Sequence, residues 1–393
     1  MRISTFGCLA VVGLAALTGC GSSSNDSSGS SSNSTATASA GAGGSDVSAA
    51  NIAYAKGQLA KFSAVPTFKS AGTPIDISSL KGKTVYSIPI TTSIPFYKDG
   101  EAAMSAAAKM AGIKYVTFPA QGKVSDFQQG FSAAINAKAS VIILNGPLPD
   151  TLAPQIRQAK AAGVKVITAH EEDVTSPTPA GVDAVAAGGF YDAARLMVDQ
   201  AIAEQNGKAV DALAISADDT RPSKGMVAAI KDELSQHCGP KCKVTVTNIP
   251  VADWATKVQP QVQSELNRDG DINTILPIFD SMAQYTDPAI RQAAAGRTVN
   301  VYSFNGTPAI TGLLNQKTSS LRGDVGESPV WIGQLTMDQV FRLMLNKPPL
   351  DKPSAPLRVF TRANVADAGN PPVSGQGFGD TAEAGYKSLW GLK

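Results

Sequence analysis

Short apolar runs alternate with amphipathic segments along most of this 393-residue chain, and the first such pair spans residues 84–118. Residues 85–90 form an uncharged run rich in β-branched side chains, which is typical of a strand covered on both faces. Residues 97–111 repeat apolar side chains every three to four positions and end before Gly112, as a helix does. The loop of residues 91–97 therefore follows the carboxyl end of a strand, where open α/β sheets bind ligands.

The alternation of strand and helix patterns continues after this opening unit. Further strands are predicted at residues 141–145, 164–169, 184–187, 209–216, 244–249, 272–278 and 299–304. Helices are predicted between them at residues 124–138, 150–161, 190–205, 222–236, 254–267 and 281–294. This spacing indicates right-handed βαβ crossovers and parallel sheets. The less regular tail adds helices at 308–314 and 329–345 and extended segments at 319–324 and 357–361, which is too many strands for one compact sheet. The sequence therefore predicts an α/β protein with two doubly wound, Rossmann-like lobes.

The first twenty residues have the anatomy of a signal peptide. Arg2 supplies a positive charge, residues 9–17 are apolar but too few to span a membrane, and Leu17-Thr18-Gly19-Cys20 follows. This ending resembles the bacterial lipoprotein box, in which the cysteine is lipidated and becomes the first residue. We therefore expect residues 1–19 to be removed and Cys20 to carry lipid; an ordinary signal peptide with a chance cysteine is the alternative.

The segment after Cys20 is rich in serine and glycine and contains almost no charge. Residues 20–46 are therefore interpreted as a flexible tether, and residues 47–81 as a weakly helical N-terminal extension packed on the outside. Charged residues make up 17% of the chain and the net charge is only +2, so no basic patch points to nucleic acid.

Two cysteines, Cys238 and Cys242, flank a Gly-Pro turn between a predicted helix and strand. Outside the cytoplasm they are expected to form a disulfide that staples this loop. Zinc binding by both sulfurs with His237 is the alternative, but no second ligand cluster follows in the sequence. No metal or cofactor is predicted.

Several local motifs resemble those of type I periplasmic solute-binding proteins of the ribose and galactose kind, over about residues 82–365. Residues 93–97, Ser-Ile-Pro-Phe-Tyr, resemble the family's Asn-x-Pro-Phe-Phe loop, which supplies a polar cap and stacking rings. Residues 164–169 resemble the strand before its hydroxyl-binding Asp-Arg pair, and residues 251–254 a segment with another stacking aromatic. Residues 279–283 resemble Asn-Asp-x-Met-Ala, and residues 301–306 resemble Val-x-Gly-Phe-Asp-Gly.

The polar positions of these motifs depart from the family pattern. His170 and Glu171 stand where the Asp-Arg pair is expected, Phe279 replaces a sugar-binding Asn, and Asn305 replaces the binding Asp. Arg221 falls close to a pocket arginine, and Asp324 to the last hinge residue. The resemblance thus implies a ligand-binding set of Ser93, Phe96, Tyr97, His170, Glu171, Arg221, Trp254, Phe279, Asn305 and Asp324. Each has a plainer interpretation: core packing for the aromatic residues, and a loop histidine or solvated charges for the polar ones.

The resemblance also implies how the lobes divide the chain. Residues 82–188 with 325–347 are expected to form the N-terminal lobe, and residues 189–324 with 348–393 the C-terminal lobe. Three hinge crossings are expected, near residues 186–189, 305–307 and 324–326, where small residues allow backbone rotation.

The function implied is that of a monomeric, lipid-anchored extracytoplasmic binding protein that delivers a sugar-like or polyol solute to an ABC transporter permease. Because the Asp-Arg pair is missing, an amine-bearing or aromatic solute stays open, as does a sensor that docks on a membrane receptor. An enzyme is not expected: there is no Gly-x-Ser-x-Gly elbow for a nucleophile, and residues 77–84 lack the opening glycine of a P-loop.

Overall fold

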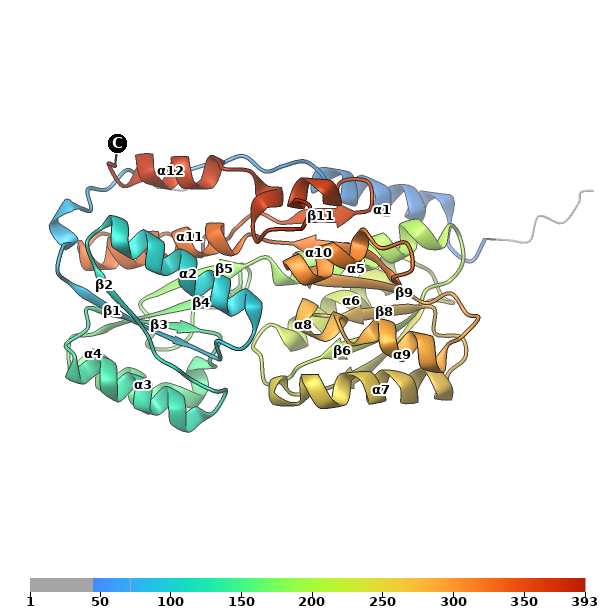
Figure 1. Cartoon of the computed structure of the whole chain (residues 1–393), viewed down its shortest axis with the longest axis horizontal. Helices are drawn as coiled ribbons and strands as arrows, with labels where there is room; N and C mark the ends of the chain where they lie inside the picture. The colour runs from blue at the N-terminus through green and yellow to red at the C-terminus, as the bar shows by residue number, and fades with distance from the viewer. Residues whose placement is uncertain (1–44, 71, 393) are drawn as a thin grey trace, which may run out of the picture. The chain divides into compact units, whose positions relative to one another are not determined.

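The computed structural model describes residues 45–70 and 72–392, and its first sheet has five parallel strands in the order β2-β1-β3-β4-β5 (Figure 1). Its strands are β1 (Thr84–Pro89), β2 (Lys114–Thr117), β3 (Val141–Asn145), β4 (Lys165–Asp173) and β5 (Ala184–Gly188). Successive side chains of β3 alternate between two cores, since Val141 and Ile143 belong to one cluster and Ile142 and Leu144 to the other. This burial on both faces explains the continuous apolar run in the sequence.

Helices cover both faces of this N-terminal lobe. The first core packs against α2 (Pro95–Met110) and α11 (Pro329–Met344), and the second against α3 (Val124–Asn136) and α4 (Ala153–Ala161), which follows the short 3₁₀ helix η2 (Pro149–Leu152). Helix α2 begins two residues before the predicted position because Pro95 occupies its first turn, where the missing N–H costs nothing.

The second sheet has six strands in the order β11-β10-β9-β8-β6-β7. They are β6 (Asp211–Ser216), β7 (Lys243–Asn248), β8 (Thr274–Pro277), β9 (Asn300–Asn305), β10 (Leu321–Gly326) and β11 (Arg358–Thr361). Its helices are α5 (Phe190–Gln205), α6 (Ser223–His237), α7 (Trp254–Arg268), α8 (Asp280–Ala283), α9 (Thr286–Ala293) and α10 (Pro308–Leu314), with η3 (Val251–Asp253) before α7. The predicted fold of two parallel-sheet lobes is confirmed, with β11 as an antiparallel edge strand.

The chain crosses between the lobes at three places between residue 82 and β11. It passes from β5 to α5 at residues 188–190, from β10 to α11 at residues 326–329, and from α11 to β11 after residue 345. The predicted crossing at residues 305–307 is wrong, because β9 and α10 both belong to the C-terminal lobe. Small residues occur at this position as they do at the other predicted crossings, but here they form a turn inside one lobe.

The N-terminal extension adds another connection between the lobes. Helix α1 (Ala49–Lys61) packs on α5 and α6 of the C-terminal lobe, where the Tyr54 ring stacks on His237 with centroids 3.7 Å apart. The chain then reaches the N-terminal lobe, where the Ile75 N–H donates to the Leu389 carbonyl at 2.8 Å and η1 (Ser78–Leu80) joins its core.

The C-terminal tail is divided between the lobes, whereas the sequence placed all of residues 348–393 in the C-terminal lobe. Strand β11, η4 (Val365–Ala368) and η5 (Gln376–Phe378) pack in the C-terminal lobe. Helix α12 (Thr381–Leu389) instead packs on α11, and Trp390 is buried with its indole N–H donating to Asp338 at 3.0 Å. The large aromatic side chains after residue 380 fill a space on α11 that sequence spacing does not reveal.

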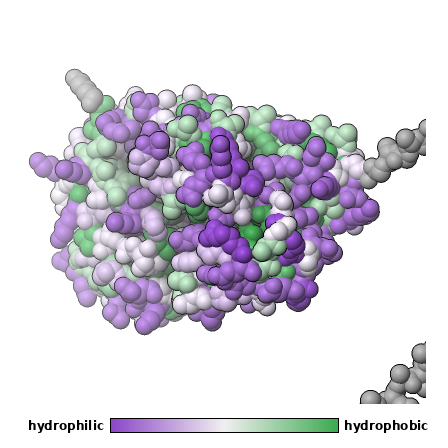
Figure 2. All heavy atoms as spheres, turned by 45° about the vertical axis from the view of Figure 1, so that its right-hand side comes forward, coloured by the Kyte–Doolittle hydropathy of each residue, from purple (hydrophilic) through white to green (hydrophobic). Residues whose placement is uncertain are grey.

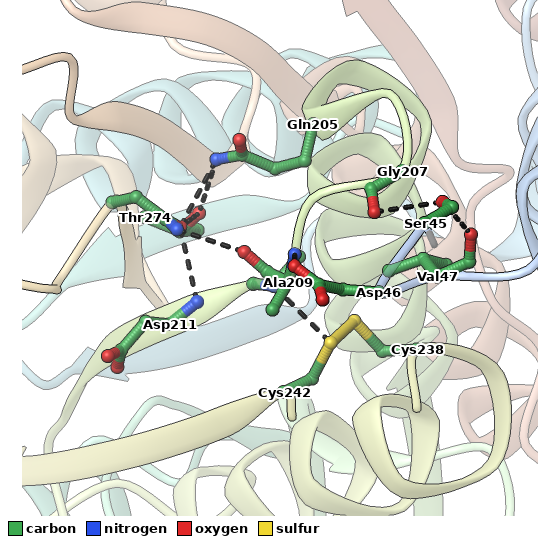
Figure 3. The surroundings of a disulfide bond; sticks show 12 residues. Ser45, Asp46, Val47, Gln205, Gly207, Ala209, Asp211, Cys238, Cys242 and Thr274 are labelled. Atoms are coloured by element: carbon green, nitrogen blue, oxygen red, sulfur yellow. Dashed lines mark hydrogen bonds between the residues drawn. A yellow bond between two sulfur atoms is a disulfide. The ribbon is translucent and has the colours of Figure 1, made fainter. Parts of the chain in front are cut away.

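The described chain begins beside the disulfide between Cys238 and Cys242, which the structure contains as predicted (Figure 3). The Asp46 N–H donates to the Gly207 carbonyl at 2.8 Å, and Lys241 pairs with the Asp46 carboxylate at 2.7 Å. The Val210 N–H donates to the Cys242 sulfur. The zinc alternative loses its ligands because the two sulfurs are bonded to each other and the His237 ring stacks on Tyr54.

Hydrophilic side chains cover most of the face drawn in Figure 2, with hydrophobic ones scattered between them. Within residues 45–392, none of the described helices is both long enough and apolar enough to cross a bilayer. The predicted signal peptide, Cys20 and the tether up to residue 44 lie outside the described residues.

Candidate functional site

A pocket lies where the carboxyl ends of both sheets face each other, and it is built from both lobes. It encloses about 440 Å³ of space not filled by atoms, part of which is open to solvent. The lining residues are Ile90, Ile94, Phe96, Tyr97, His170, Glu171, Phe190, Thr220, Pro222, Val251, Trp254, Phe279, Ser281 and Asn305.

Aromatic side chains form a wall of the pocket on each lobe. Phe96 and Tyr97 come from the first turn of α2, and their rings meet edge to face with centroids 6.0 Å apart. Trp254 is the first residue of α7, and its indole N–H donates to the Ile249 carbonyl at 2.9 Å, which fixes the ring. Phe279 precedes α8 and lies 6.1 Å from Trp254 between centroids. All four predicted aromatic residues therefore line one pocket.

His170 and Glu171 point into the pocket because β4 is irregular at its end. The register of β4 with β5 shifts between Ala169 and Asp173, and His170 has a left-handed backbone with φ of 55°. A bulge of this kind re-aims side chains, and bulges are common beside functional sites. The His170 ring lies between Phe96 and Phe190, with centroids 4.8 and 4.7 Å away.

The His170 ring is held by Glu327, which the sequence did not single out. Its Nε2 pairs with Glu327 Oε1, and the Asn305 side-chain N–H donates to the same oxygen at 3.2 Å. Glu327 is buried just after the carboxyl end of β10. Its position after a strand end was the available signal, because that is the edge at which ligands bind.

Glu171 is the lining residue with an unsatisfied polar atom. Its side chain is 1% exposed, and its Oε2 has no hydrogen-bond partner among the described residues. Burial and then the charge of Glu172 raise the pKa of Glu171 well above its ordinary value, against a hydrogen bond from the Arg221 backbone.

Arg221 does not line the pocket; its guanidinium connects the lobes at the rim. It belongs to the C-terminal lobe, and it pairs with Asp150 at 2.6 Å and Glu172 at 2.8 Å in the N-terminal lobe. Burial alone would lower the pKa of Arg221, but these two carboxylates outweigh it and raise that pKa. Two acids of the other lobe thus occupy two of the guanidinium nitrogens, and the contact of Arg221 with a ligand stays a prediction.

Two other predicted residues also lie outside the pocket lining. Ser93 is exposed, and its backbone N–H donates to the Thr91 hydroxyl at 3.1 Å, so Ser93 lies in a turn that the Thr91 side chain caps. Asp324 is fully buried and accepts from the Gly306 N–H at 3.3 Å. Its neighbour Asp280 accepts from the Ser303 hydroxyl and from Thr307, each at 2.7 Å. These contacts leave Asp324 facing the turn after β9 rather than the pocket.

The comparisons with known proteins agree with this architecture. Residues 85–348 match the sequence model of the periplasmic binding protein domain, which is more than half of the chain. The chain belongs to this family. The family consists of solute-binding proteins, and the fold is that of periplasmic binding proteins of type I. A comparison with curated proteins gives no match.

Several solved structures are similar to this periplasmic binding protein. A 5-methylthioribose transporter solute-binding protein from Thermotoga lettingae is 16% identical with a TM-score of 0.67, over 81% of this chain and 100% of that one. An ABC transporter solute-binding protein from Mycobacterium smegmatis with bound glycerol is 18% identical with a TM-score of 0.66, over 74% and 98%. One from Agrobacterium vitis with bound allitol is 19% identical with a TM-score of 0.64, over 74% and 98%. At these identities the likeness shows the fold.

One group of acids in the binding protein could be taken for a metal site. Among the described residues, Asp211, Asp269 and Asp271 have carboxylate oxygens close together. They lie at the amino ends of β6 and β8, away from the pocket, and the Lys243 ammonium contacts Asp211 at 2.8 Å and Asp269 at 3.4 Å. Because a lysine already supplies the positive charge, we assign no metal to this group.

Replacing Arg221 with Gln should favour the separated lobes. The change leaves Glu172 buried without its cation, and we expect it to weaken the contact between the lobes by about 1 to 2 kcal/mol, since the guanidinium is partly exposed to solvent. Small-angle scattering should show a larger radius of gyration than in the wild type. Asp150→Asn, at an exposed carboxylate, should change it less, and Arg195→Gln not at all. Identical scattering of Arg221→Gln and wild type would contradict the contact.

The buried Asp324 should make stability depend on pH. Burial, and then the charge of Asp280, raise the pKa of Asp324 well above its ordinary value. The folded protein therefore keeps a proton that the unfolded chain loses near pH 4, so the free energy of unfolding should fall as pH rises above that value. Asp324→Asn keeps a donor toward Asp280 and should flatten this slope in urea unfolding between pH 5 and 8. The exposed control Asp232→Asn should keep the wild-type slope; an unchanged slope in Asp324→Asn would refute the assignment.

Proposed function

We propose that the protein is a lipid-anchored extracytoplasmic solute-binding protein of an ABC importer. Its solute would be a small sugar-like or polyol molecule that binds between the lobes. The observation that carries the proposal is the pocket itself, which Phe96 and Tyr97 of one lobe line together with Trp254 and Phe279 of the other. Flat apolar rings suit the faces of small cyclic molecules, and the polar groups of His170, Glu171 and Asn305 suit their hydroxyls.

The solved relatives support this class of solute. Similar solute-binding proteins have been solved with glycerol, allitol, 5-methylthioribose and D-arabinose bound. All are small polyhydroxylated compounds. For this chain, the solute class is inferred from the shared architecture and from the polar groups of its own pocket.

Hinge closure is the mechanism that the two aromatic walls favour. A solute that lies on the rings of one lobe gains the contacts of the other only when the lobes approach. It therefore shifts an existing equilibrium toward the closed form by its greater affinity for that form. Arg221 would add to closure, because its partners Asp150 and Glu172 lie on the opposite lobe.

The anchor and the localisation rest on Cys20, which lies outside the described residues. The tether would leave the folded body at Ser45, whose neighbours Asp46 and Val47 are hydrogen-bonded to Gly207 beside the disulfide. A tether of this composition spans on the order of 25 to 30 Å, so the binding protein would stay near its permease and raise the local concentration of solute-loaded protein.

A thermal-shift screen against monosaccharides and polyols tests the solute class. A true ligand at about a hundred times its dissociation constant should stabilise the fold by roughly 2.7 kcal/mol. The same ligand should change the tryptophan fluorescence of the wild type and of Trp331→Phe, whose ring lies in the N-terminal core, but not that of Trp254→Phe. A Trp254→Phe protein that still shows the fluorescence change of the wild type would place the solute elsewhere.

Replacing Cys20 with Ala tests the anchor. We expect the wild type in the detergent phase of a Triton X-114 partition of whole cells, and Cys20→Ala in the aqueous phase, because the acyl chains are lost. Cys8→Ala is a matched control within the segment to be removed, and it should partition like the wild type. A Cys20→Ala protein that stays in the detergent phase would refute lipidation at this residue.

A further inference from the structure

The pocket has an acidic character that the proposed class of solute does not by itself explain. Glu171 is the carboxylate among its lining residues, and that lining contains no lysine or arginine. Other carboxyl groups lie around it: after burial, the charges of Glu171, Glu327 and Asp219 raise the pKa of the partly buried Tyr97. An anionic solute would find no lysine or arginine among the lining residues to pair with.

The basic side chains near the pocket already have partners. The Arg221 guanidinium is held by Glu172 and Asp150, and the His170 ring is held by Glu327. The Lys352 ammonium donates to the Ser176 carbonyl at 2.8 Å. None of these groups forms an ion pair with Glu171 in the part of the chain that the structure describes.

Glu171 thus has an unpaired oxygen in a pocket that several aromatic side chains also line. Its side chain is almost completely buried, and Oε2 has no partner among the described residues. Burial opposes the charged form of this carboxyl and raises its pKa, although the Arg221 backbone acts in the opposite direction. A bound molecule that supplies a positively charged donor would offset the cost of ionising Glu171 and would gain most from this position.

We propose that the natural solute is a cation: a sugar-sized molecule with an apolar ring face and a protonated amino group that donates to Glu171 Oε2. Its ring would lie between the Phe96–Tyr97 wall and the Trp254–Phe279 wall, where aromatic faces also attract an ammonium group. This inference rests on the proposed function, because it uses the same pocket and narrows the solute class to amino sugars and amino polyols. Glu171 is then the residue that selects for charge.

Matched pairs of probes test the charge preference on the intact wild-type protein. D-glucosamine against D-glucose, D-galactosamine against D-galactose, and D-glucamine against D-glucitol each differ by an amino group in place of a hydroxyl. In isothermal titration calorimetry at pH 7, we expect the amine of at least one pair to bind ten times or more tightly than its neutral partner. N-acetyl-D-glucosamine, which keeps the nitrogen but not the charge, should lose that advantage.

The variant Glu171→Gln tests whether Glu171 is the source of the preference. It keeps the size of the side chain and removes its charge, so the ratio between amine and neutral partner should fall to within threefold of one. Asp218→Asn removes a nearby exposed charge that does not line the pocket, and it should keep the wild-type ratio. A Glu171→Gln protein that retains the full ratio would overturn the role of Glu171.

The outcomes separate this inference from the proposed function. Neutral partners that bind as tightly as the amines in every pair would overturn the cationic solute and leave a sugar- or polyol-binding protein in place. Absence of binding by every probe would contradict both. The wild-type comparison gives this answer even if Glu171→Gln does not fold.

Discussion

The contact between His170 and Glu327 determines how the part of the pocket around His170 is arranged. His170 comes from the end of β4 in the N-terminal lobe, and Glu327 lies at a crossing between the lobes. Asn305, at the end of β9 in the C-terminal lobe, donates to the same carboxylate. The ring fixed in this way packs against Phe96 and Phe190, so one buried polar contact holds segments of both lobes and orients part of the aromatic lining. Buried polar groups that satisfy one another in this way specify a single arrangement.

The segments outside the family match bear on how freely the lobes can move. The N-terminal extension runs from α1 on the C-terminal lobe to Ile75 beside Leu389 on the N-terminal lobe, and the C-terminal tail passes from η5 to α12. In Figure 1 these segments lie along the upper edge of the molecule. They add connections to the hinge crossings, and any rotation of the lobes has to be absorbed in these connections as well.

Much of the fold follows from the sequence because its causes are local. The run Val141–Asn145 is apolar at every position but the last, since both faces of β3 are buried, and Trp254 and Phe96 lie at the starts of helices that strand-end loops introduce. The partners of Arg221 and Asp324 could not be predicted in this way. Asp150 and Glu172 are far from Arg221 along the chain, and only the folded sheet brings the charge of Asp280 near Asp324. The place of Trp390 on α11 is likewise a matter of long-range packing.

The most direct measurement is a crystal structure of the protein saturated with its tightest-binding solute from the screen. The account predicts solute density between the ring walls of Phe96 and Trp254, with a nitrogen of the solute within hydrogen-bond distance of Glu171 Oε2 and Arg221 still paired with Glu172. Two results would contradict the account. One is solute density outside this pocket. The other is a solute in the pocket whose main partner is Arg221, with Glu171 left without a contact.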